Sequence, residues 1–284
     1  MGNGLLAGKR GLVFGVANER SIAWVCAKAC AAEGASLIFS YLGASQERRV
    51  RKLVDAELPG SGMFHCDVSR DEEIAAFFDN VRAEWESIDF VIHSVAFANR
   101  EDLKDTFVET SRAGFALALD ISAYSLVPVT REAAKIMRDG GSVVAMSYYG
   151  AEKVIPRYNV MGVAKAALEA ACRYLAYDMG PRNIRVNCIS PGPLRTLSSS
   201  AIQGMRTMLE IAQQSAPLRR TMTQEEVAKT ALYLLSDLSS GVTGEVIHVD
   251  CGLNILGIMG AAPAGNPGAT DASPGAQQSN QQRD

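Results

Sequence analysis

Short apolar runs alternate with longer amphipathic segments along most of the chain. The runs that predict buried strands are 11–15, 35–39, 62–66, 88–93, 142–146, 184–189 and 245–250. The segments that predict helices are 21–34, 46–58, one capped by Ser69, a long region over 111–138 interrupted near Pro128, 163–177, 198–211 and 225–235. This alternation predicts an α/β fold with a doubly wound parallel sheet, covered on both faces through right-handed crossovers.

A sheet of this kind binds ligands where the winding reverses, beyond the carboxyl ends of its strands. Here that place is the end of the first and fourth strands, near Gly15 and Ser94. The periodic pattern stops near residue 258, so we predict a single domain over 1–258. From Gly260 to Asp284 there is no aromatic residue and no aliphatic residue larger than Ala, which predicts a disordered tail over 259–284.

The composition is that of a globular protein, with 48% hydrophobic and 21% charged residues among 284 and a net charge of -3. No cluster of Lys and Arg is interleaved with aromatic residues, which argues against nucleic acid as a partner. No apolar run reaches the roughly 18 residues of a membrane span, so we expect no membrane insertion.

Cysteine usage and the N-terminal sequence favour a cytoplasmic protein. The six cysteines form no Cys-x-x-Cys pair, and the segment before Lys9 is too short for a signal peptide. We interpret the cysteines as reduced and structural. His65 and His248 lie in apolar runs, so we assign them structural roles and expect no metal site.

The stretch from Ser147 to Lys165 carries the candidate chemistry. A strand leads into Tyr148, and a predicted helix carries Tyr158 and Lys165. Seven helical residues rotate by about 700°, so these two side chains are expected to share a face. The ammonium would favour the phenolate and make Tyr158 a better donor to a developing oxyanion. The alternative is a surface lysine and a half-buried tyrosine without function.

The first strand-helix turn lacks the three-glycine dinucleotide fingerprint and keeps only Gly15 at the sharp turn. Ser21 stands at the helix start, where it is expected to cap the helix and offer its hydroxyl and free amides to a pyrophosphate. A serine cap without any ligand is the alternative.

The second strand ends in Ser40-Tyr41-Leu42, without the acid that usually grips an adenosine ribose. This leaves NADH against NADPH open, but no Arg or Lys occurs until Arg48, which favours NADH. Asp67, after the third strand, suits adenine recognition or ordinary loop chemistry equally.

Two further strand ends offer room for a cofactor. Small side chains over 93–98 would let it approach the backbone, although tight packing explains them as well. The segment 190–197 could wrap a nicotinamide, with Thr196 donating to a phosphate.

Together these segments resemble the bacterial enoyl-acyl carrier protein reductases of the short-chain dehydrogenase/reductase superfamily, over residues 5–258. The resemblance rests on Gly15-x5-Ser21-Ile22-Ala23, Cys66-Asp67-Val68, His93-Ser94, Ser147-Tyr148, Tyr158-Asn-Val-Met-Gly-Val-Ala-Lys165, Arg185–Ser190, Gly192–Leu197 and Gly244–Asp250. Ordinary members of the superfamily place Tyr and Lys four residues apart, whereas Gly162 occupies that position here.

The resemblance implies a Rossmann-like fold and reduction of a trans-2-enoyl thioester by NADH. Tyr158 would hydrogen-bond the thioester carbonyl as it becomes an enolate, Lys165 would hold the nicotinamide ribose, and Tyr148 would line the acyl site. The family's cofactor positions fall on Gly15, Ser21, Ile22, Leu42, Asp67, Val68, Val95, Lys165, Leu194, Arg195, Thr196, Leu197 and Ser198, and its substrate contact falls on Ala98.

The same resemblance implies an acyl carrier protein as the partner that delivers the substrate, and a homotetramer. The helix over 198–211 has an apolar side but few charges, so its sequence argues little for docking an acidic carrier protein. Two rival functions are a ketone or alcohol oxidoreductase on the same fold, and a catalytically silent dinucleotide-binding protein. The presence of both Tyr158 and Lys165 argues against the silent protein.

Overall fold

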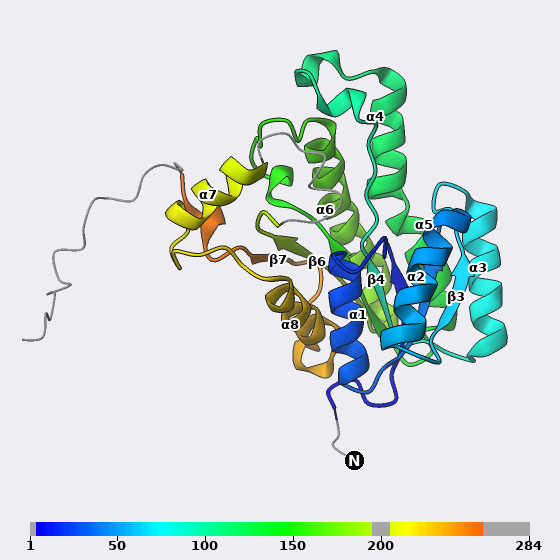
Figure 1. Ribbon diagram of the computed structural model, residues 1–284. Coiled ribbons are helices and arrows are strands. Elements are labelled where there is room, and N and C mark those ends of the chain that lie inside the picture. The colour runs from blue at the N-terminus through cyan, green and yellow to red at the C-terminus, as the bar shows by residue number, and fades with distance from the viewer. Residues whose placement is uncertain (1–3, 195–204, 258–284) are drawn as a thin grey trace, which may run out of the picture.

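Seven parallel strands form one sheet in the order β3-β2-β1-β4-β5-β6-β7 (Figure 1). The structure is a computed structural model that describes residues 4–194 and 205–257. The strands are β1 (Arg10–Phe14), β2 (Ser36–Tyr41), β3 (Gly62–His65), β4 (Phe90–His93), β5 (Gly141–Met146), β6 (Ile184–Pro191) and β7 (Val246–Val249). The winding reverses between β1 and β4, which confirms the predicted doubly wound sheet.

Helices cover both faces of this sheet because successive strand residues point to opposite sides. In β1, Leu12 and Phe14 join the core under one set of helices, and Val13 joins the core under the other. The helices are α1 (Ile22–Ala32), α2 (Gly43–Glu57), α3 (Asp71–Glu84), α4 (Arg112–Leu119), α5 (Leu126–Ile136), α6 (Val160–Met179), α7 (Met205–Ser215) and α8 (Gln224–Leu235). Helices α1, α2 and α8 cover one face, and α3, α5 and α6 cover the other (Figure 1).

The long helical region is interrupted at a different place from the one predicted. A π-helical turn over Asp120–Tyr124 separates α4 from α5. Pro128 lies in the first turn of α5, where a backbone N–H has no partner within the helix and its loss costs little. The predicted interruption near Pro128 is therefore wrong, and α4 extends beyond the sheet from the π-helical turn (Figure 1).

Two other predicted helix starts also need correction. Arg70, not Ser69, occupies the cap position of α3, and the Ser69 hydroxyl instead donates to Asp67 Oδ1 at 2.7 Å. Three acidic residues in the first turn of α3 favour the helix N-terminus electrostatically without a serine cap. The predicted helix over 198–211 extends to Ser215 as α7, and its first part, 198–204, lies outside the described residues, as does the predicted tail over 259–284.

Among the described residues, one helical stretch, Arg112–Ile136, is long and apolar enough to cross a membrane by those two criteria alone. Half of its most apolar part is buried inside the fold. The apolar face of this stretch packs in the core beneath α3 and α6, as expected for a core helix.

We predict that Gly15→Ala destabilises the fold, because Gly15 has a φ of 97° and an added Cβ would lie 2.0 Å from the Ser94 carbonyl oxygen. A strained backbone and a clash with backbone should together lower the free energy of unfolding by about 2–4 kcal/mol. Urea denaturation followed by tryptophan fluorescence measures this loss. Gly180→Ala is the matched control, because nothing lies within 4 Å of its added Cβ. Equal midpoints for the two variants would contradict the prediction.

Candidate active site

The three predicted catalytic residues lie around the carboxyl end of β5. Lys165 of α6 is only 4% exposed, and its Nζ donates to the Met146 carbonyl oxygen at 2.7 Å. Tyr148 follows two residues later, and its ring packs edge-on against the Tyr158 ring, with centroids 4.8 Å apart and planes at 69°. The three residues of the predicted catalytic group therefore converge on one strand end, as the sequence suggested.

The way Tyr158 reaches this place differs from the prediction. Helix α6 begins at Val160, and Asn159 before it has a φ of 42° and a ψ of -124°, outside the helical region. Tyr158 therefore precedes the helix, and a shared helical face with Lys165 is wrong. Lys165 instead contacts the end of β5 directly, whereas Tyr158 contacts Tyr148 just beyond it.

Two glycines make room for the Tyr158 ring. A Cβ on Gly150 would lie 2.4 Å from Tyr158 Cδ1, and a Cβ on Gly162 would lie 2.7 Å from the Gly150 carbonyl oxygen. The position four after Tyr158, where ordinary superfamily members have lysine, is thus packed too closely to the Gly150 backbone for any side chain.

Burial sets the protonation of these groups. It raises the pKa of Tyr158 well above its usual value, with a smaller contribution from Tyr148, and it raises the pKa of Tyr148 to about 12. Burial lowers the pKa of Lys165 to about 8, and the neighbouring Cys188 and Glu169 oppose this shift. The expectation that Lys165 favours a phenolate is therefore wrong here: Tyr158 is held as a phenol that can donate a proton or hydrogen bond.

In the first strand-helix turn, the Ser21 side chain binds the preceding loop and not the helix. Ser21 occupies the cap position of α1, but its hydroxyl accepts hydrogen bonds from the backbone N–H groups of Ala17 (2.9 Å) and Asn18 (3.1 Å), not from the helix. The predicted side-chain cap is wrong. The first amides of α1, beginning at Ile22, have no partners inside the helix and suit a pyrophosphate.

The end of β2, where this fold usually offers an acid, is instead contacted by a glutamine from the first turn of α2. The Gln46 amide oxygen accepts from the Leu42 N–H at 2.6 Å, and its amide nitrogen donates to the Val16 carbonyl at 2.7 Å. Leu42 itself is 56% exposed. Gln46 thus bridges the two loops that flank an adenosine ribose in such folds, and sequence reasoning missed it because the partner loop is 30 residues away.

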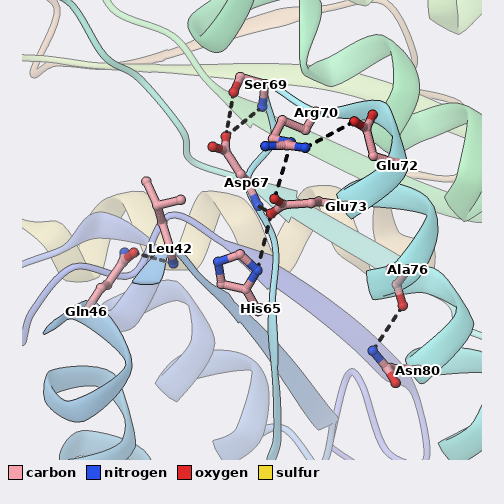
Figure 2. A network of polar contacts seen from close by, with 10 residues as sticks. All are labelled: Leu42, Gln46, His65, Asp67, Ser69, Arg70, Glu72, Glu73, Ala76 and Asn80. Atoms are coloured by element: carbon pink, nitrogen blue, oxygen red, sulfur yellow. Dashed lines mark hydrogen bonds and ion pairs between the residues drawn. The ribbon is translucent and has the colours of Figure 1, made fainter. Parts of the chain in front are cut away.

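The end of β3 shows a loop network (Figure 2). Asp67 Oδ1 accepts from Ser69, and the Asp67 N–H donates to Glu73, which also contacts His65 at 3.2 Å. These contacts are the loop chemistry that the sequence left open. Adenine recognition by Asp67, and the cofactor position at half-buried Val68, stay predictions.

The segment after β4 is held by serines of the π-helical turn. The buried Ser122 hydroxyl accepts from the Phe97 N–H at 2.9 Å and donates to the Phe97 carbonyl at 3.1 Å, and Ser125 contacts His93 Nε2 at 2.9 Å. Because Phe97 lies between Val95 and Ala98, Ser122 fixes the segment in which cofactor and substrate contacts are predicted. A π-helical turn is frequent at functional sites, but sequence alone gives little sign of one.

The end of β6 supplies part of the predicted nicotinamide segment. Leu194 packs half-buried against the core under α1 and α8, while Arg195, Thr196, Leu197 and Ser198 lie outside the described residues. Ser190 Oγ is buried with no hydrogen-bond partner among the described residues. An ammonium has three protons, and Lys165 uses one of them on the Met146 carbonyl. The remaining protons of Lys165 and the Ser190 hydroxyl are suited to hydrogen-bond the hydroxyls of a ribose.

A doubly wound sheet with a tight first turn, and with a buried tyrosine and lysine at the end of β5, defines a dinucleotide-dependent reductase of the short-chain dehydrogenase type. The family model described as "Enoyl-(Acyl carrier protein) reductase" matches residues 15–254. The chain belongs to this family.

Relatives with similar sequences agree with this assignment. The NADH-dependent enoyl-[acyl-carrier-protein] reductase FabI of Bacillus cereus is 54% identical over 254 residues, which cover 89% of this chain and 99% of that protein. The reductase of the same name from Rickettsia prowazekii is 50% identical over 257 residues, covering 90% of this chain and 98% of that protein.

Solved structures also match along nearly their whole length. The Bacillus cereus reductase, crystallised with NADP+ and an indole naphthyridinone, superposes with a TM-score of 0.88 at 53% identity, covering 90% of this chain and 100% of that one. The Anaplasma phagocytophilum reductase in complex with NAD gives a TM-score of 0.86 at 43% identity, covering 92% and 98%.

We predict that Gln46→Leu weakens binding of NADH and of ADP alone by about three- to tenfold, because both loop-bridging hydrogen bonds are lost. Fluorescence titration with NADH and calorimetric titration with ADP measure the two dissociation constants. Arg49→Ala, an exposed change on the same helix, is the control. Unchanged ADP affinity in Gln46→Leu would show that the bridge does not serve the adenosine half of the site.

Proposed function

We propose that this protein is an NADH-dependent enoyl-acyl carrier protein reductase, which reduces trans-2-enoyl thioesters in the last step of the fatty-acid elongation cycle. The observation that carries the proposal is the buried Tyr158 phenol beside Tyr148 at the end of β5, with Lys165 anchored to the same strand end. Family membership over residues 15–254 supports the same reaction.

Tyr158 is proposed to stabilise the oxygen on which charge develops. As the double bond is reduced, the thioester carbonyl oxygen gains negative charge, and a phenol held protonated by burial can donate a hydrogen bond or a proton to it. Tyr148 packs against the Tyr158 ring and is proposed to limit its movement while lining the acyl site. Ala98, held through Phe97 by Ser122, is the proposed substrate contact.

NADH, when bound, supplies the hydride that adds to the β-carbon of the enoyl group. Lys165 is proposed to hold the nicotinamide ribose with the protons that Met146 does not use. Gly15, Ser21 and Ile22 are proposed to receive the pyrophosphate at the start of α1. Leu42, Asp67, Val68, Val95 and the segment Leu194–Ser198 are proposed to complete the cofactor site.

We further propose an acyl carrier protein as the substrate-bearing partner, a homotetrameric assembly and action in the cytoplasm. Tyr174 and Tyr177 of α6 are 77% and 83% exposed, which suits burial against another copy of the chain. All six cysteines are buried free thiols, which suits a reducing compartment. Light scattering after size exclusion tests the assembly.

The first test is oxidation of NADH with a trans-2-enoyl thioester, followed by near-ultraviolet absorbance. We expect rapid oxidation with the enoyl substrate, little with acetoacetyl thioester, and a lower rate when NADPH replaces NADH. Activity on the keto substrate instead would support a ketone reductase on the same fold. No activity on either, with NADH still binding, would support a silent dinucleotide-binding protein.

We predict a division of labour between the two central side chains. Tyr158→Phe should lower turnover by about a hundredfold or more with little change in NADH affinity, because it removes only the donor to the carbonyl oxygen. Lys165→Ala should raise the dissociation constant for NADH by about tenfold or more, because it removes a charged donor. Steady-state rates and NADH titration separate the effects, and equal loss of NADH binding in both variants would contradict these roles.

A further inference from the structure

A buried carboxylate lies one helical turn beyond Lys165 and has no role in the reaction described above. Glu169 is 6% exposed and lies four residues after Lys165, so the two side chains share one face of α6. The Ser147 hydroxyl, itself 6% exposed, donates to Glu169 Oε1. A carboxylate this deep is costly unless it is hydrogen-bonded and near a positive charge.

The partners of Lys165 and Glu169 are consecutive residues. Lys165 donates to the carbonyl oxygen of Met146, and Glu169 accepts from the side chain of Ser147. Two bonds, one helical turn apart, therefore fasten the end of β5 to α6 directly before Tyr148.

We propose that Glu169 is a positioning residue of the active site, whose negative charge keeps Lys165 in its ammonium form and whose bond to Ser147 fixes the strand end that carries Tyr148. The inference rests on the proposed role of Lys165 at the nicotinamide ribose. It assigns the catalytic lysine a carboxylate partner from its own helix.

The charged and titratable groups near the pair come from several elements. Burial raises the pKa of Glu169, and its hydrogen bond to Ser147 opposes this shift. From β6, Cys188 faces Lys165, and from β4, the buried His93 stays neutral because burial and the Lys165 charge lower its pKa to about 3. Around Glu169 the other charges come from Glu152, from His248 of β7 and from Arg173 of α6. Glu152 pairs with His248 at 2.7 Å and does not act on Lys165, so Glu169 is the carboxylate that does.

The charge of Glu169 should affect how NADH affinity changes with pH. The ammonium is the binding form, so affinity for NADH should be constant at low pH and fall above the pKa of Lys165, which burial sets at about 8. Removing the Glu169 charge lowers that pKa further, by roughly one unit for a close opposite charge. The fall in affinity should then begin at lower pH.

The test measures the dissociation constant for NADH between pH 6 and 9, without any enoyl substrate, in wild type, Glu169→Gln and Glu152→Gln. Glu169→Gln keeps the shape and an acceptor for Ser147. It should match wild type near pH 6 and bind roughly threefold more weakly at pH 7.5, as a shift of about one unit requires. Glu152→Gln removes a nearby carboxylate and should follow the wild-type curve.

Two outcomes would overturn the proposal. One is a loss of affinity in Glu169→Gln that is equal at every pH, because this is what a purely structural role gives. The other is a wild-type affinity that does not fall above about pH 8. If Glu169→Gln does not fold, Glu169→Asp should shift the curve in the same direction by less, and an unshifted curve in that variant also overturns the proposal.

Ser147→Ala separates the two parts of the claim, since it keeps the carboxylate and removes its bond. It should lower the turnover number while moving the pH curve less than Glu169→Gln does. NADH binding is measured without enoyl substrate. Absence of enoyl reduction would therefore reject the proposed function, but the binding test of Glu169 could still be interpreted.

Discussion

The hydrogen bond from Lys165 to the Met146 carbonyl is the contact on which the active site depends. A parallel strand buried on both faces ends with carbonyl groups that the sheet no longer pairs, and each needs a partner. Here the partner is a buried ammonium whose pKa burial lowers to about 8. The strand end thus receives a donor, and the lysine is held with two protons left for a ligand.

On the adenosine side of the site, too, one side chain satisfies backbone groups that would otherwise lack a hydrogen-bond partner. Gln46 satisfies the Leu42 N–H and the Val16 carbonyl at once, so the loop after β1 and the turn after β2 are held together without an acid. The Leu42 N–H is therefore already used, and the nearby cation Arg51 is paired with Glu47. This physical arrangement agrees with the NADH dependence named for the relatives.

The sequence predicted the sheet and most helices, because these follow from the periodicity of apolar residues. It did not predict features set by the backbone angles of single residues. Alternating strands and helices correctly predicted a doubly wound parallel sheet whose winding reverses between the first and fourth strands, since handedness and burial leave few choices. The position of Tyr158 outside α6 could not be predicted from the sequence. Helix α6 starts only after Asn159 because that residue has a positive φ, which the periodicity of apolar residues does not indicate. The π-helical turn was missed for the same reason, and Pro128 was misread as an interruption.

Although Tyr158 lies outside the helix, it still lies against Tyr148 at the end of β5, and packing explains why. Had Tyr158 been helical, its ring would have been fixed by α6 alone. Outside the helix it is placed by contact instead: Tyr148 lies against one part of the ring, and Gly150 is a glycine because a Cβ there would come within 2.4 Å of it. The close approach of Gly162 to the Gly150 backbone then excludes a lysine four residues after Tyr158. A lysine for this site must come from further along α6, and Lys165 is the residue whose ammonium reaches the end of β5.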